Sequence, residues 1–90
     1  MATIQDDRTE TQRETHRWAV IGTDPFMSGW GGAKGGASYA GWACTSADAD
    51  ACLRMVRRRG DMLRVRLVSL PGYRASGAAH CHIYVYGAEA

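Results

Sequence analysis

The chain has 90 residues, of which 46% are hydrophobic and 22% charged, and its formal net charge is +2. These values are typical of one small globular domain and argue against a disordered chain or a strongly basic nucleic-acid binder. No apolar run approaches the roughly 20 residues that span a bilayer. The first residues also lack the apolar core of a secretory signal, so we expect a soluble, cytoplasmic protein without a membrane partner.

Residues 1–16 are polar and show no apolar periodicity, so we predict a flexible tail, followed by a single domain over residues 17–90. The first strand is expected at Trp18–Thr23, a bulky and β-branched run. Pro25 ends this run because proline cannot donate a ladder hydrogen bond. A second strand is expected at Tyr39–Cys44, which makes the two strands a hairpin with a long tip.

The tip of this hairpin, Ser28–Ser38, is rich in glycine. It differs from a phosphate-binding P-loop because Lys34 precedes Gly35 and a strand, rather than a helix, follows. A rigid aromatic anchor in an adaptable loop is typical of protein-binding sites. The alternative is that Phe26 or Trp30 folds back over the open end of a small core. The side chains that we expect to meet a partner here are Phe26, Met27, Trp30 and Lys34.

The sequence predicts one helix, at about Ala47–Arg59. Thr45 or Ser46 is a natural N-cap, and Thr45 with Asp48 resembles a capping box. Gly60 supplies the left-handed residue that ends many helices. The arginines of the last turn complement the helix dipole, which is the structural explanation for this basic cluster. The buried stripe is expected to consist of Ala49, Cys52, Leu53 and Val56.

Two further strands are expected at Leu63–Leu70 and Ala79–Tyr86, because apolar and polar residues alternate in both. We predict that they form a hairpin whose odd-numbered apolar residues share the core face. On the other face, this register sets Arg66 beside Tyr84 and Arg64 beside Tyr86.

The expected fold is therefore α+β with the order ββαββ: a four-stranded, antiparallel-rich sheet with one helix on one face. A single helix of about 10 Å diameter cannot cover both faces of such a sheet. The uncovered face is predicted to be a second partner-binding surface or the seam of a homodimer. Its residues are Arg64, Arg66, His80, His82, Tyr84 and Tyr86.

The pair His80 and His82 suggests a metal site, because residues two apart in a strand point the same way. A third ligand would have to come from Cys44, His16 or an acidic residue. The strand resembles that of the histidine-triad nucleotide hydrolases, with His82 at the nucleophilic position, but Tyr84 stands where the third histidine belongs. It also resembles the metal-binding strand of HUH endonucleases, which need a catalytic tyrosine beyond the motif, where only residues 87–90 remain.

A metal-dependent hydrolase or nuclease using His80 and His82 is therefore one alternative function. We predict no cofactor and no metal, and we expect Cys44, Cys52 and Cys81 to be buried, reduced thiols. A second alternative is a module that binds RNA or single-stranded DNA, because bases stack on aromatic residues of a sheet and arginines meet phosphates. That module would use Arg64, Arg66, Tyr84 and Tyr86.

The stretches DPFMSGWGGAKGGASYAGWAC and HCHIYVY resemble small proteins of bacteriophages and prophages. The resemblance implies a compact protein that binds and blocks host machinery, including CRISPR-type defence complexes. We therefore predict a non-enzymatic inhibitor of a host protein or nucleoprotein complex, acting through the glycine-rich loop.

Overall fold

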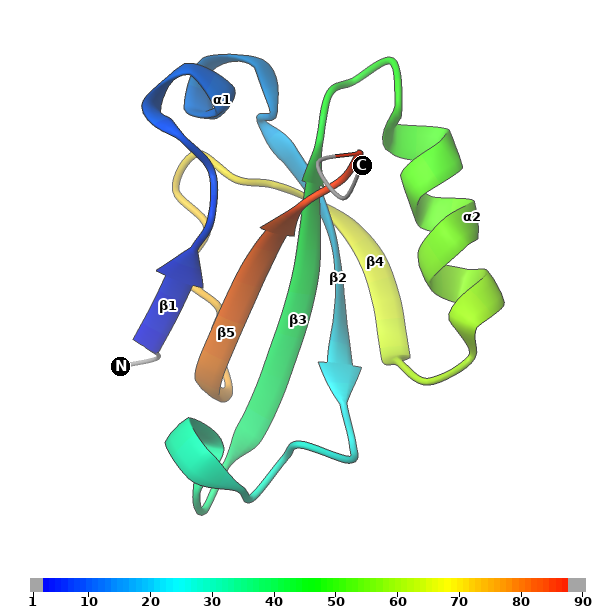
Figure 1. Ribbon diagram of the computed structural model, residues 1–90. Helices are drawn as coiled ribbons and strands as arrows, with labels where there is room; N and C mark the ends of the chain where they lie inside the picture. Colours follow the sequence, from blue (N-terminus) through cyan, green and yellow to red (C-terminus); the bar gives the residue numbers. More distant parts are fainter. Residues whose placement is uncertain (1–2, 88–90) are drawn as a thin grey trace.

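A computed structural model describes residues 3–87 as a five-stranded mixed sheet in the order β1-β5-β3-β2-β4 (Figure 1). The strands are β1 (Thr3–Asp6), β2 (Trp18–Asp24), β3 (Ala37–Cys44), β4 (Leu63–Ser69) and β5 (Ala78–Val85). The helices are α1 (Glu10–Thr15), α2 (Ala49–Arg59) and the short 3₁₀ turn η1 (Gly31–Ala33). β5 runs parallel to β1 and β3, whereas β2 is antiparallel to β3 and β4. The α+β class is confirmed, but the sheet has one more strand and the molecule one more helix than predicted.

The first hairpin and the main helix form as predicted. β2 and β3 pair without interruption from Trp18 opposite Cys44 to Asp24 opposite Ser38. α2 ends at Gly60, whose φ of 72° is left-handed. Its apolar stripe packs on the sheet. The N-cap is Asp48 and not Thr45 or Ser46 as predicted. Thr45 Oγ1 accepts a hydrogen bond from the N–H of Asp48 at 3.2 Å.

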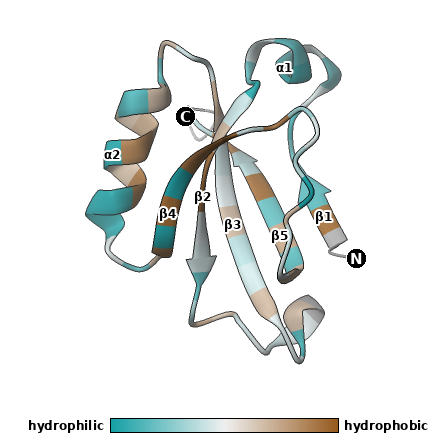
Figure 2. Cartoon of the chain, turned by 180° about the vertical axis from the view of Figure 1, so that it is seen from behind, coloured by the Kyte–Doolittle hydropathy of each residue, from teal (hydrophilic) through white to brown (hydrophobic). Residues whose placement is uncertain are grey.

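The predicted hairpin of β4 and β5 is wrong, because β2 and β3 lie between these strands. Hydropathy does alternate along the first half of β4 (Figure 2), but alternation shows only which residues share a face. It does not identify the neighbouring strand. The link between β4 and β5, residues 70–77, crosses the face of the sheet opposite α2 and buries Leu70 and Ala75 there.

The sheet therefore has a core on each face. The core under α2 consists of Val20, Ala40, Trp42, Cys44, Cys52 and Val56. The core under residues 70–77 consists of Ala19, Ile21, Ala43, Leu70, Ala75, Cys81 and Ile83. The prediction that the face opposite the helix stays open is wrong, because a loop covers it. The three cysteines are buried and unpaired, as predicted.

The N-terminal segment also differs from the prediction, because residues 3–15 contain β1 and α1 instead of a tail without structure. β1 pairs with β5, with Ile4 opposite Cys81. α1 begins with a capping box in which Thr9 Oγ1 accepts from Gln12 N at 3.1 Å and Gln12 Oε1 accepts from Thr9 N at 2.8 Å. The signal for this helix was Thr9 followed three residues later by Gln12.

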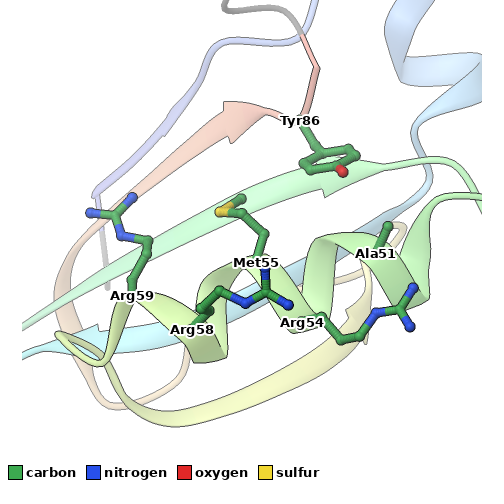
Figure 3. Close-up of a pocket in the computed structure, with 6 residues that line it drawn as sticks. All are labelled: Ala51, Arg54, Met55, Arg58, Arg59 and Tyr86. Carbon is green, nitrogen blue, oxygen red and sulfur yellow. The ribbon is translucent and has the colours of Figure 1, made fainter.

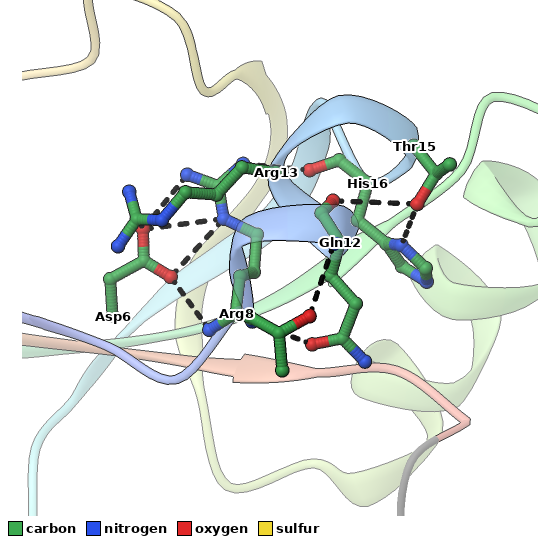
Figure 4. A network of polar contacts seen from close by, with 7 residues as sticks. Asp6, Arg8, Gln12, Arg13, Thr15 and His16 are labelled. Atoms are coloured by element: carbon green, nitrogen blue, oxygen red, sulfur yellow. Dashed lines mark hydrogen bonds and ion pairs between the residues drawn. The ribbon is translucent and has the colours of Figure 1, made fainter.

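An ionic network fastens α1 to both neighbouring strands (Figure 4). Arg8 Nη2 lies 2.8 Å from Asp6 Oδ2, and Arg8 Nη1 donates to the carbonyl of His16 at 2.9 Å. Arg13 approaches the same carboxylate at 3.4 Å. The Arg8 and Asp6 side chains are only 10% and 16% exposed, so this network is more strongly coupled than an ordinary surface ion pair.

Because of this network, we expect the free energy of unfolding to decrease when the pH becomes acidic. Burial by itself would raise the pKa of Asp6, but the hydrogen bonds and charge of Arg8, with the charge of Arg13, lower it below its ordinary value of 3.8. Such a carboxylate stabilises the folded state above its unfolded pKa, and the contribution is lost as the pH falls through the folded pKa. We expect Asp6→Asn to lower the free energy of unfolding at neutral pH by about 2 kcal/mol, a difference that narrows below about pH 4.

Urea unfolding of both proteins between neutral and acid pH measures this difference. Glu14→Gln, an exposed position on α1, is the matched control and should leave the pH profile unchanged. A constant difference at every pH would contradict the ionic origin of the stabilisation.

Candidate functional site

The loop between β2 and β3 is held at its base by one aspartate and one serine. Asp24 Oδ1 accepts the backbone N–H groups of Phe26 at 3.0 Å and Met27 at 3.2 Å. Ser28 Oγ donates to the Asp24 carbonyl at 2.7 Å and accepts from Ser38 N at 3.0 Å. These bonds tie the end of β2 to the start of β3, so the loop leaves the sheet in a fixed direction.

The outer half of the loop is also hydrogen-bonded. Gly29 N donates to the Gly36 carbonyl at 2.9 Å, and η1 closes between Trp30 and Ala33 at 2.9 Å. Ala33 is only 2% exposed and anchors this turn. Gly29 has a φ of 87°, which a residue with a side chain adopts only under strain. The glycines here therefore allow an ordered, hydrogen-bonded turn, and the loop is not a flexible linker.

Three large apolar side chains project from this ordered loop. Phe26 is 82% exposed, Trp30 71% and Met27 46%, and together they line a hollow of about 280 Å³. We call these three residues the apolar tip. The alternative that Phe26 or Trp30 folds back over the core is wrong, and Lys34 is exposed on the same loop. Neighbouring exposed apolar side chains of this size commonly mark interaction sites.

Because the apolar tip contributes little to the core, we expect the double substitution Phe26→Ser and Trp30→Ser to change the free energy of unfolding by less than about 0.5 kcal/mol. Trp42→Ala is the matched control, because Trp42 is only 4% exposed and its truncation should cost about 3 kcal/mol. Urea unfolding followed by circular dichroism measures both. A double variant as unstable as the control would show that the tip belongs to the core.

A second exposed region lies on the face of the sheet that carries α2. The helix packs mainly on β2 and β4, so it leaves β5 and β1 uncovered on that side (Figure 1). The polar row of β5 faces this side, because Tyr84 stacks on Trp42 of the α2 core. The row that we predicted opposite the helix, His80, His82, Tyr84 and Tyr86, therefore lies on the same face as the helix.

Two of these side chains, His82 and Tyr84, belong to a continuous stack that crosses the sheet. The Arg59 guanidinium lies 4.8 Å from the centre of the Trp42 ring, and the Trp42 and Tyr84 ring centres are 5.6 Å apart. Tyr84 stacks on His82 with 3.9 Å between ring centres. His82 Nε2 lies 2.8 Å from Asp7 Oδ2 at the edge of the sheet. Because these side chains stack on one another, the stacked ring faces are already in contact within the protein.

The predicted combination of arginines and tyrosines on one face is wrong. Arg66 lies on the opposite face, with its guanidinium 5.3 Å from the Tyr39 ring. Arg64 has a φ of 54° at an irregularity in the pairing of β2 and β4. Both are on the strand at the far edge of the sheet from β5, so neither is beside Tyr84.

His80 and His82 gain no third metal ligand within residues 3–87. Within this part of the chain, no three His, Cys, Asp or Glu side chains converge on a point where they would hold a metal ion. His82 contacts Asp7 and Tyr84 instead. Burial raises the pKa of Cys52 to about 12 and that of Cys81 to about 11, so both thiols stay protonated at neutral pH and are poor nucleophiles.

A hollow of about 570 Å³ lies between α2 and the end of β5 (Figure 3). Its lining consists of Ala51, Arg54, Met55, Arg58, Arg59 and Tyr86. Arg59 also borders a second hollow of about 210 Å³ that reaches Trp42, Tyr84 and Asp24. We call the first hollow the arginine groove.

The sequence analysis explained the arginine cluster at the end of α2 by the helix dipole. The signal it missed was the spacing of Arg54 and Arg58, four residues apart and therefore on one side of α2.

None of the helices within residues 3–87 combines the length and the hydrophobicity that crossing a membrane requires. No protein-family model matches the chain, and neither a curated protein nor a solved structure is significantly similar to it.

Proposed function

We propose that the protein is a non-enzymatic binding protein whose apolar tip inserts into a pocket of a host protein or nucleoprotein complex and blocks it. The observation that carries the proposal is the exposure of Phe26, Met27 and Trp30 on a loop that is hydrogen-bonded along its length. Aromatic residues and methionine are enriched at protein interfaces, where a few buried anchors supply most of the binding energy.

The rigidity of the loop supports a role in binding. A loop that is already ordered loses little conformational entropy when it binds, so more of the contact energy appears as affinity. The hydrogen bonds of Asp24 and Ser28 hold the base of the loop without using the tip side chains. The tip is thus free to make its contacts with a partner. Its apolar character favours a protein pocket over a nucleic acid, whose surface is dominated by phosphate charge.

A photo-crosslinking amino acid at position 26 tests the proposal in an extract of the cells in which the protein acts. We expect one defined crosslinked species, which excess unlabelled protein suppresses and which excess Trp30→Ala protein suppresses at least about 30-fold less well. The same crosslinker at Leu63, which is 55% exposed on β4, is the matched control and should give no such species.

Two outcomes would contradict the proposal. A product with twice the mass of the chain would identify the tip as a homodimer contact. Equal suppression by the Trp30→Ala protein and the unchanged protein would show that the tip does not recognise the crosslinked species.

A further inference from the structure

We propose that the arginine groove binds a single-stranded nucleic acid, with phosphates on Arg54 and Arg58 and a base against Tyr86. The groove and the apolar tip share no lining residue. The inference therefore does not rest on the proposed function, and either one can fail without the other.

The charges of the groove are the first argument. Arg54 and Arg58 are exposed, and within residues 3–87 neither is in an ion pair. Like charges four residues apart on a helix destabilise it. Arg59 differs, because its Nη2 lies 3.0 Å from Asp61 Oδ2 and its guanidinium covers Trp42. Two guanidiniums are therefore available to an anion, and their planar forks match phosphate oxygens.

The apolar part of the groove is the second argument. Tyr86 is half-buried and faces Met55 across the hollow (Figure 3). Trp42, Tyr84 and His82 stack on one another. The described contacts give Tyr86 no aromatic partner, so its ring is available to a base. Proteins bind single strands by combining an aromatic ring, on which a base can stack, with positively charged side chains that contact the phosphates. Tyr86, Arg54 and Arg58 provide this combination.

The neighbouring strands argue against an acidic peptide as the occupant. A peptide in extended form usually binds by adding a strand to a free sheet edge. β5 lies between β1 and β3 and is paired on both sides, so the groove offers no free edge. Arg59 lines both this hollow and the second hollow, so an extended strand in the groove would reach the second hollow beside Arg59. Asp24 and Asp61 lie at that end, so we place the phosphate contacts at Arg54 and Arg58.

Fluorescence anisotropy with labelled oligothymidylate and oligouridylate of about ten nucleotides tests the assignment. For two phosphate contacts we expect the logarithm of the binding constant to fall with the logarithm of salt concentration with a slope of about −1.4. Arg54→Ala and Arg58→Ala should each reduce this slope by about 0.7, and the double variant should abolish binding. Arg74→Ala is the matched control, because it removes the same charge from an exposed position in residues 70–77.

The aromatic contact is tested separately. Tyr86→Phe should bind as the unchanged protein does, whereas Tyr86→Leu should bind at least about fivefold more weakly. The Phe26→Ser and Trp30→Ser double variant should bind the oligonucleotides normally.

Three results would overturn the inference. The first is the absence of oligonucleotide binding at low salt. The second is an equal loss of binding in Arg54→Ala and Arg74→Ala. The third is competition by poly-glutamate of equal charge that is as strong as competition by an unlabelled oligonucleotide, because the groove would then accept any polyanion.

Discussion

Gly41→Val is expected to lower the free energy of unfolding by about 3 kcal/mol and the melting temperature by about 12–24 °C. Gly41 lies on the central strand β3, opposite Ile21 on one side and Ile83 on the other. A Cβ atom at this position would lie 2.7 Å from Ile21 Cγ1 and 3.1 Å from Ile83 Cδ1. Both isoleucines are fully buried, so neither can move aside without disturbing the core.

Gly41→Ala tests the same contact through the sign of its effect. In an unhindered strand, replacing glycine by alanine stabilises a protein by about 0.4–1 kcal/mol, because the unfolded chain loses freedom. Here we expect destabilisation, and a smaller additional loss when Ile21→Ala is already present. Urea unfolding of the two single variants and the double variant measures this coupling. An alanine variant more stable than the unchanged protein would refute the packing described here.

Deletion of residues 1–8 is expected to lower the free energy of unfolding by about 3 kcal/mol, since several hydrogen bonds worth about 1 kcal/mol each are lost. The deletion removes β1, the bond from Asp7 N to the Ile83 carbonyl at 2.9 Å, and the contact between Asp7 and His82. It also exposes one side of β5. Chemical denaturation measures the loss, and hydrogen exchange at the amides of β5 should become faster.

Ile4→Ser is the control for this deletion, because it leaves the backbone of β1 in place. Ile4 is already 41% exposed, so we expect a cost below about 1 kcal/mol. If the truncated protein unfolded at the same urea concentration as the full chain, residues 3–6 would behave as the tail that the polar composition suggested.

The elements with strong local signals were predicted correctly. α2 has an apolar stripe and a terminal glycine, and β2 and β3 are bulky runs joined by one loop, so local sequence determines them. β1 was missed because four polar-rich residues at a sheet edge carry no periodic pattern. The order of the strands was missed for a different reason. The alternation in β4 and β5 shows which residues share a face, but it is compatible with several neighbouring strands. Only packing in three dimensions places β4 beside β2 and β5 beside β3.

The candidate site was predicted in part for the same reasons. Phe26, Met27 and Trp30 were singled out because large apolar residues in a glycine-rich loop are conspicuous in the sequence, and all three side chains are exposed. The surface that combined Arg66 with Tyr84 was wrong because it assumed that β4 and β5 are neighbours. The arginine groove went unpredicted, because Arg54 and Tyr86 are far apart in the sequence and meet only through the placement of α2 above the sheet.

The parallel pairing of β1 with β5 has a consequence for how the chain folds. The segment nearest the amino end acquires its partner only when residues 78–85 are available, so closure of this ladder spans almost the whole polypeptide. Contacts of such large sequence separation slow folding. Until they form, one side of β5 is an unpaired edge, which is prone to associate with other chains. We therefore expect the hairpin of β2 and β3 with α2 to form early during refolding, and protection of β1 to appear last.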